Sequence, residues 1–66
     1  MEILLNDNTY TIKHASHLKA LVAELELPEQ SVAVAIEGDI IPRHQWQQTP
    51  LVEGIQIAVF QAIAGG

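Results

Sequence analysis

The last two residues, Gly65 and Gly66, are the part of this sequence best suited to chemistry. Glycine has no Cβ, so a terminal glycine pair can enter a channel that is too narrow for any side chain. The short apolar segment Ala62-Ile63-Ala64 stands directly before the pair. We expect such an end to deliver its carboxylate into the active site of another protein. The alternative interpretation is a frayed terminus that has no role.

The histidines offer two other arrangements, and neither is favoured. His14, His17 and His44 bring the nitrogen ligands of a metal site, but the predicted helix begins between the first two and no carboxylate stands at a characteristic offset. Ser16, His17 and Asp39 have the residue types of a nucleophilic triad, which needs a larger cleft than this chain can build. We therefore expect no metal site, and we expect Ser16 to cap a helix.

Three acids and one aromatic residue have ordinary structural interpretations. Glu24, Glu26 and Glu29 would act as general acids or bases only if their surroundings separated their pKa values. A solvated helix face is the favoured interpretation of these acids. Trp46 has the mixed polar and apolar character of an interface anchor, but a lone Trp in a small protein more often covers the core. Arg43 can form an ion pair either with an acidic residue of a partner or with a nearby acidic residue of this chain.

Length and charge restrict the class of partner. The chain has 66 residues, which allows one domain over residues 1–66 and no large catalytic cleft. Three basic and eight acidic residues give a net charge of -5, which disfavours binding to nucleic acid and to anionic membranes. An acidic domain suits a partner protein that has a basic docking surface.

The absence of cysteine excludes a disulfide framework, a cysteine-based zinc site and a cysteine nucleophile. The segment from Met1 to Asn6 lacks the basic region of a secretory signal. No apolar run approaches the roughly 18 residues that suggest a membrane span. We therefore expect a protein of the cytoplasm that is stabilised by packing alone.

Two periodicities predict the elements that position these residues. Leucine and valine recur at i, i+3, i+4 and i+7 in a helix that Ser16 begins and Leu27-Pro28 ends. Polar turns separate apolar alternations, and residues 43–54 are mostly connection. The predicted strands are 1–5, 9–12, 32–36, 40–41 and 55–60, with residues 32–36 placed centrally in the sheet. This order predicts a small α+β domain in which one helix covers one face of a sheet.

The last strand predicts a docking surface on the other face. Ile55, Ile57 and Val59 alternate with Gln56, Ala58 and Phe60, so Phe60 faces away from the helix. No second helix in the sequence can cover that side, which favours docking of a partner. The apolar residues expected there are Leu4, Ala33, Ala35, Ala58 and Phe60.

Three stretches of the chain resemble the sulfur carrier family of thiamine-thiazole biosynthesis (ThiS). They are Val34 to Arg43 with its Ile-Ile-Pro-Arg end, Trp46 with Thr49-Pro50-Leu51 and Glu53-Gly54, and Phe60 to Gly66. The resemblance covers essentially all of the chain. It implies a ubiquitin-like β-grasp fold, in which a mixed sheet of four to five strands packs one main helix on one face. We also expect a flexible C-terminal tail of about residues 61–66 after the last strand.

The resemblance also implies a protein cosubstrate that is not itself an enzyme. A partner adenylating enzyme of the ThiF type would use ATP and magnesium to join the Gly66 carboxylate to AMP. Sulfur relayed from a cysteine desulfurase would then displace AMP and leave a thiocarboxylate, which thiazole synthase of the ThiG type would consume. The carrier would bind no cofactor itself. Gly65 would give access to the partner's channel, and the partner-binding residues would be Leu4, Ala35, Ala58, Phe60, Ile63 and Ala64.

Two alternatives stay open. The small subunit of molybdopterin synthase is a related carrier with the same terminal chemistry, although that family often has prolines where this chain has Gln61-Ala62. The other alternative is a non-catalytic β-grasp interaction module whose glycines are only frayed.

Overall fold

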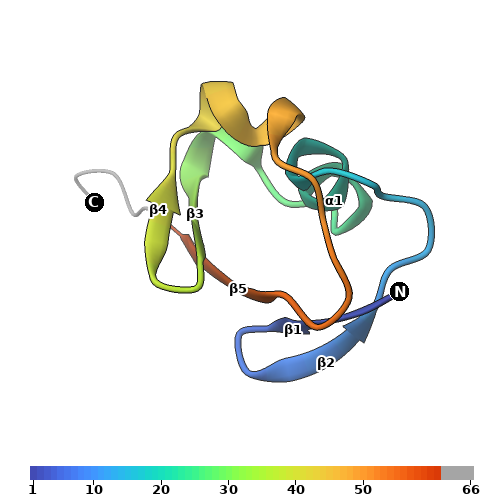
Figure 1. Ribbon diagram of the computed structural model, residues 1–66. Coiled ribbons are helices and arrows are strands. Elements are labelled where there is room, and N and C mark those ends of the chain that lie inside the picture. The colour runs from blue at the N-terminus through green and yellow to red at the C-terminus, as the bar shows by residue number, and fades with distance from the viewer. Residues whose placement is uncertain (62–66) are drawn as a thin grey trace.

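A computed structural model of the protein describes residues 1–61, in which a five-stranded sheet curves around one α-helix (Figure 1). The fold class predicted from the sequence is therefore confirmed. The elements in chain order are β1 (Glu2–Leu5), β2 (Asn8–Thr11), α1 (Leu18–Glu24), the 3₁₀ helix η1 (Glu29–Ser31), β3 (Val32–Ile36), β4 (Asp39–Ile41), the 3₁₀ helix η2 (Arg43–Gln48) and β5 (Gln56–Gln61).

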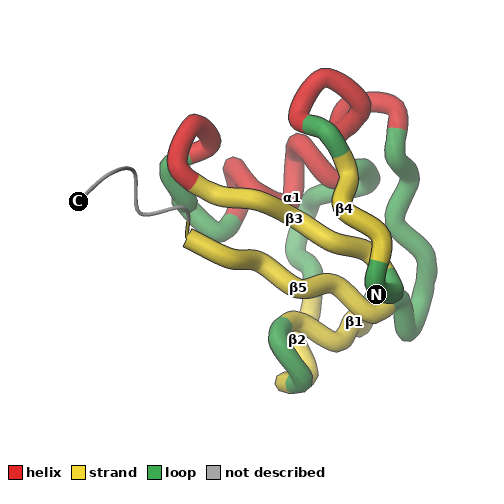
Figure 2. The backbone as a smooth tube through the Cα atoms, turned by 90° about the vertical axis from the view of Figure 1, so that its left-hand side faces the viewer, coloured by secondary structure: helices red, strands yellow, loops and turns green. Residues whose placement is uncertain are grey.

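The sheet is mixed, with the strand order β2-β1-β5-β3-β4 (Figure 2). The first strand lies parallel to β5, and the other neighbouring strands run antiparallel. The last strand is therefore the middle of the sheet, and β3 lies between β5 and β4. Residues 32–36 were predicted to be central in the sheet. The strand β3 does have a neighbour on each side, although the middle strand is β5.

Both hairpins turn through two residues that have positive φ, which is the backbone of the tight turns that suit the twist of a hairpin. Asn6 and Asp7 have φ of 51° and 68°, and Glu37 and Gly38 have φ of 49° and 92°. The second strand of each hairpin therefore begins one residue earlier than predicted, at Asn8 and at Asp39.

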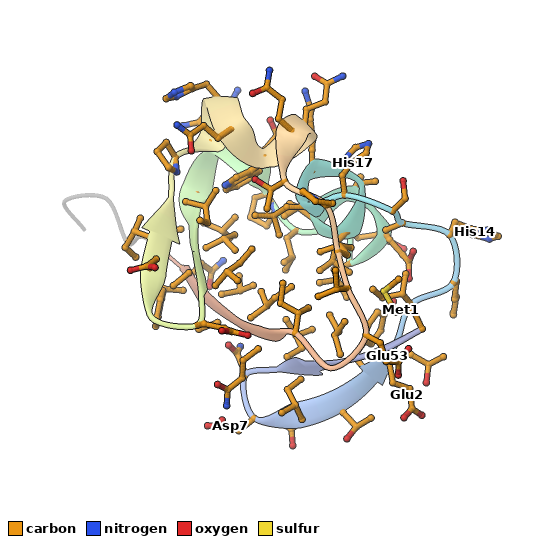
Figure 3. All side chains as sticks on the ribbon, viewed as in Figure 1. Met1, Glu2, Asp7, His14, His17 and Glu53 are labelled. Carbon is orange, nitrogen blue, oxygen red and sulfur yellow. The ribbon has the colours of Figure 1, made fainter. Side chains whose placement is uncertain are left out.

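The predicted helical stripe packs into the core. Leu18, Leu21 and Val22 are buried on α1, and they face the inner side of the sheet. Figure 3 shows apolar side chains filling the space between the sheet and the helices. The other buried apolar residues are Ile3, Ile12, Ala15, Val34, Ala35, Trp46, Leu51, Ile55 and Ile57.

The helix begins one residue later than predicted, because His17 and not Ser16 is its N-cap. The Nδ1 atom of His17 accepts a hydrogen bond from the Ala20 N–H at 3.2 Å. A distant segment fixes this position, since the carbonyl of Ser16 accepts from the Leu51 N–H at 3.1 Å. His17 also forms a bridge with Pro50. The prediction that Ser16 caps the helix is therefore wrong.

The helix also ends before Leu27-Pro28, which was predicted to stop it. Glu26 has a φ of 56°, and its N–H bonds to the Ala23 carbonyl at 3.0 Å. The Leu27 N–H bonds to the Val22 carbonyl at 3.2 Å. This pair of bonds around a left-handed residue is a Schellman motif, which satisfies carbonyls that the helix end leaves free. The backbone of Glu26, and not the proline, ends the helix.

Residues 43–54 do more than connect strands. They contain η2, which carries Trp46 into the core at 1% exposure. The Trp46 Nε1–H donates to the Ile41 carbonyl at 2.9 Å, so its polar atom is satisfied while the ring is buried. Leu51 follows as a further core residue. Trp46 therefore covers the core, and the alternative interpretation as an interface anchor is wrong.

Glu24 holds the connection between β2 and α1. Its Oε2 accepts from the Tyr10 O–H at 2.6 Å and from the Lys13 N–H at 2.9 Å. Its Oε1 accepts from the N–H groups of His14 at 2.9 Å and Ala15 at 3.0 Å. The Tyr10 bond first, and the backbone bonds after it, lower the Glu24 pKa from 4.5 to about 2. The same hydrogen bond raises the Tyr10 pKa. The solvated-face interpretation is therefore wrong for Glu24.

We expect His17→Ala to destabilise the protein by about 1 kcal/mol, because the mutant leaves a helix N–H without its cap. Ser16→Ala is the matched control, and it should change stability by less than about 0.5 kcal/mol. Urea unfolding followed by circular dichroism measures both values. Equal losses in the two variants would contradict the assignment of the cap.

The Glu24 carboxylate makes stability depend on pH. Its pKa is lower in the folded state, so its contribution is complete above pH 4.5 and is lost as the pH falls toward 2. In Glu24→Gln the melting temperature should be lower at pH 7 and should fall less between pH 4.5 and 2 than in the wild type.

Glu26→Gln is the control, because the Glu26 side chain is exposed on the same helix end. This control should keep the wild-type dependence of melting temperature on pH. A Glu24→Gln curve parallel to that of the wild type would show that the four hydrogen bonds have no part in acid unfolding.

Candidate functional site

The predicted docking residues share the side of the sheet away from α1. Phe60 lies opposite Ala33, and Ala58 lies opposite Ala35, in the register of β3 and β5. Leu4 lies beside Gln56 at the start of β5. We call this side the open face, and its residues are Leu4, Ala33, Ala35, Ile40, Gln56, Ala58 and Phe60.

Two large side chains supply most of the apolar surface of the open face. Phe60 is 51% exposed and Ile40 is 62% exposed. Ala58 and Leu4 are half-buried. Ala35 is only 6% exposed, because it is a small residue of an inner strand with neighbours on both sides. Ala35 therefore forms the floor of the face and offers a partner little contact area.

Ile40 was not among the predicted docking residues. Its place follows from the turn, because a two-residue connection at Glu37 and Gly38 pairs Ile40 with Ala35. If the turn is counted as two residues instead of three, the sequence places Ile40 on the open face. The alternation along β4 then puts Ile41 inside and Ile40 outside.

A shallow depression lies on the open face. Its apolar lining includes Ile40, Ala58 and Phe60, and the acids Asp7 and Glu37 also line it. None of the three basic residues of the chain lines it. The open face therefore complements an apolar surface that carries basic residues around it.

The predicted reactive end lies beyond the described part of the chain. Gly65, Gly66, Ile63 and Ala64 fall in residues 62–66, outside the described residues. Gln61 is the last residue of β5 and lies opposite Val32, so the predicted tail does not begin at 61. The strand that carries Phe60 therefore leads directly into the segment that ends at Gly66.

The other candidate arrangements do not assemble among residues 1–61. No group of three His, Cys, Asp or Glu side chains there is placed to hold a metal ion. His14 and His17 point in different directions from the start of α1 and the loop before it (Figure 3). The His17 Nδ1 atom is already used as the helix cap, and Asp39 belongs to the β3–β4 hairpin. Within the described residues, no helix has the length and apolar character to cross a membrane.

The fold and the open face define a small ubiquitin-like β-grasp domain. The model of the ThiS family matches residues 3–66. The sulfur carrier protein ThiS of Escherichia coli strain K12 is 38% identical over 66 residues, and the match covers 100% of both chains. The chain therefore belongs to the ThiS family, and the resemblance stated from its sequence is confirmed.

Two solved structures agree with this fold. The crystal structure of the thiamine biosynthesis protein ThiS from Geobacter metallireducens has a TM-score of 0.84 at 20% identity and covers 100% of each chain. A solution structure of a thiamine biosynthesis protein from the same organism has a TM-score of 0.80 at 20% identity. It covers 100% of this chain and 88% of its own. These similarities confirm the β-grasp fold.

Proposed function

We propose that this protein is a sulfur carrier of thiamine biosynthesis in the cytoplasm, and that it is a cosubstrate and not an enzyme. The observation that carries the proposal is the match with the Escherichia coli sulfur carrier, which covers the whole of both chains. The diglycine end, Gly65-Gly66, falls within that match. The family match favours this function over the molybdopterin carrier and over a module without chemistry.

The chemistry belongs to the Gly66 carboxylate. In the active site of an adenylating enzyme, a carboxylate oxygen attacks the α-phosphate of magnesium-bound ATP, and pyrophosphate leaves. The product is an acyl adenylate, in which AMP is a good leaving group. The terminal sulfur of a persulfide, which a cysteine desulfurase forms, then attacks the acyl carbon and displaces AMP. A thiol reduces the resulting acyl disulfide, which releases a thiocarboxylate. Thiazole synthase takes the sulfur from this group.

The open face is the surface on which the adenylating enzyme docks. Phe60 and Ile40 supply its exposed apolar area, and Asp7 and Glu37 favour a partner with a basic rim. Docking there places the end of β5 against the partner, so that the following residues can extend into its active site. Ile63 and Ala64 contact the partner in this arrangement. Gly65 passes through a channel that has no room for a Cβ.

Charge on the open face should block adenylation without unfolding the protein. Phe60→Glu and Ile40→Glu each place a carboxylate on an exposed position, so both variants should keep a cooperative thermal transition. Both should lose at least about tenfold in ATP–pyrophosphate exchange with the adenylating enzyme, because the interface would bury an unpaired charge.

Val52→Glu is the matched control, because Val52 is 55% exposed and is not among the residues that line the depression on the open face. It should exchange pyrophosphate at the wild-type rate. Wild-type exchange in both open-face variants would contradict docking on this face.

A residue added after Gly66 should abolish the function, because it turns the reactive carboxylate into an ordinary amide. An N-terminal extension of the same size should be tolerated. The measurement is growth of an Escherichia coli strain that lacks its own thiazole sulfur carrier, on medium without thiazole. A strain that lacks the molybdopterin carrier tests the alternative function in parallel. Growth supported by a C-terminally extended protein that intact-mass analysis shows to be uncleaved would refute the proposal.

A further inference from the structure

The two sides of β5 have unequal partners. On one side, β3 pairs with its last five residues, from Ile57 opposite Ile36 to Gln61 opposite Val32. On the other side, β1 pairs only at its first two residues, Gln56 and Ile57. The β1-side edge of β5 is therefore not covered by a strand of residues 1–61 beyond Ile57.

The backbone groups of alternate residues point to that edge. The Ile55 carbonyl accepts from the Leu4 N–H, and the Ile57 carbonyl accepts from the Asn6 N–H, both at 2.9 Å. The next residue in this series is Val59. Its N–H donates to the Asn6 Oδ1 at 2.8 Å, and its carbonyl accepts from the Asn6 Nδ2 at 3.4 Å. The main chain of β1 turns into β2 at Asn6. The side-chain amide of Asn6 therefore makes the two hydrogen bonds to Val59 that a further residue of β1 would have made.

Gln61 is the following residue of the series, two positions after Val59. By the alternation along a strand, its N–H and carbonyl face the same edge. No strand of residues 1–61 pairs with it there. Unpaired strand edges are the places where an extended segment of another chain can add. Among residues 1–61, the end of β5 therefore has a short edge that no strand covers, and we call it the free edge.

An apolar hollow lies beside this edge, on the inner side of the sheet. Its apolar lining consists of half-buried residues that pack against the edge of the core, and Asn6 and Gln61 complete it. A strand added along Gln61 would direct alternate side chains to this side of the sheet. The apolar lining residues are Leu5, Leu25, Leu27, Val32 and Val59.

Two acids follow lining residues of the hollow in the sequence. Asp7 and Glu26 are exposed and adjoin its lining residues in sequence. None of the three basic residues, Lys13, Lys19 and Arg43, belongs to the lining. This charge favours an occupant that carries Lys or Arg on either side of its apolar residue.

We propose that the free edge of β5 at Gln61 accepts an extended segment of a partner protein as an added strand. An apolar side chain of the segment fills the hollow, and its backbone pairs with Gln61. Basic residues of the segment lie near Asp7 and Glu26. This hollow is on the opposite side of the sheet from Phe60 and Ile40, but Asn6 and Asp7 also line the depression on the open face. The Phe60→Glu variant therefore serves to separate the two surfaces.

The test uses a synthetic nine-residue peptide with alternating apolar and threonine residues and a lysine near each end. Its binding is followed by amide exchange and by methyl and amide shifts in NMR spectra of the full chain. The Gln61 amide should become protected, and the shifts should centre on Leu5, Leu27 and Val59. Phe60→Glu is the matched control and should bind the peptide as the wild type does.

Two N-methylated forms of the peptide separate strand addition from simple apolar contact. One is methylated at the odd residues and the other at the even residues, and an added strand turns only one of these sets toward β5. One form should therefore lose at least tenfold in affinity, and the other should bind as the unmodified peptide does. The combined change Asp7→Asn with Glu26→Gln should weaken binding of the unmodified peptide by about threefold at low salt.

Several results would overturn the proposal. One is that the Gln61 amide stays unprotected at the highest soluble peptide concentration. Another is that the two methylated forms bind with equal affinity. A third is that the NMR shifts centre on Ile40 and Phe60. Protection of Gln61 that depends on protein concentration without peptide would assign the edge to a second copy of this chain, and would also overturn it.

Discussion

One helix of seven residues and the 3₁₀ helix η2 must cover a five-stranded sheet, and they suffice for only one face. A chain of this size buries only about 60% of its unfolded surface, so an apolar face left over is expected. Leu18, Leu21 and Trp46 are buried against the inner face of the sheet. Phe60 and Ile40 remain exposed on the other face. Incomplete coverage is therefore what leaves the open face available for the docking that we propose.

The sequence was most informative where neighbouring residues determine the outcome. The stripe on α1 and the alternation along β5 are local patterns, so the buried and exposed sides of both could be predicted. The helix start could not, because the contact of His17 with Pro50 joins segments far apart in the chain. The helix end was missed because Glu26 adopts a backbone that glycine usually supplies. The burial of Trp46 likewise depends on η2 packing beside α1.

The residues of the candidate site also differ in whether the neighbouring sequence could predict them. Phe60 could be placed from the alternation of its own strand, whereas Ile40 required the length of a turn that sequence alone left uncertain. The most perturbed carboxylate of the described residues, Glu24, has both oxygens engaged by hydrogen bonds and serves the fold. A perturbed pKa can mark structure as well as function. The chemistry proposed for this protein accordingly belongs to Gly66, which no property of the folded core reveals.

The most direct measurement is fragment mass spectrometry of the protein after reaction with magnesium-ATP, the adenylating enzyme, a cysteine desulfurase, cysteine and a thiol reductant. The exchange of one oxygen for sulfur should map to the fragment that ends in Gly66. Fragment mapping is essential, because oxidation of Met1 or Trp46 gives nearly the same gain in mass. Omission of ATP should abolish the exchange. Sulfur found in any other fragment, or an unchanged Gly66 fragment from the complete reaction, would contradict the carrier mechanism.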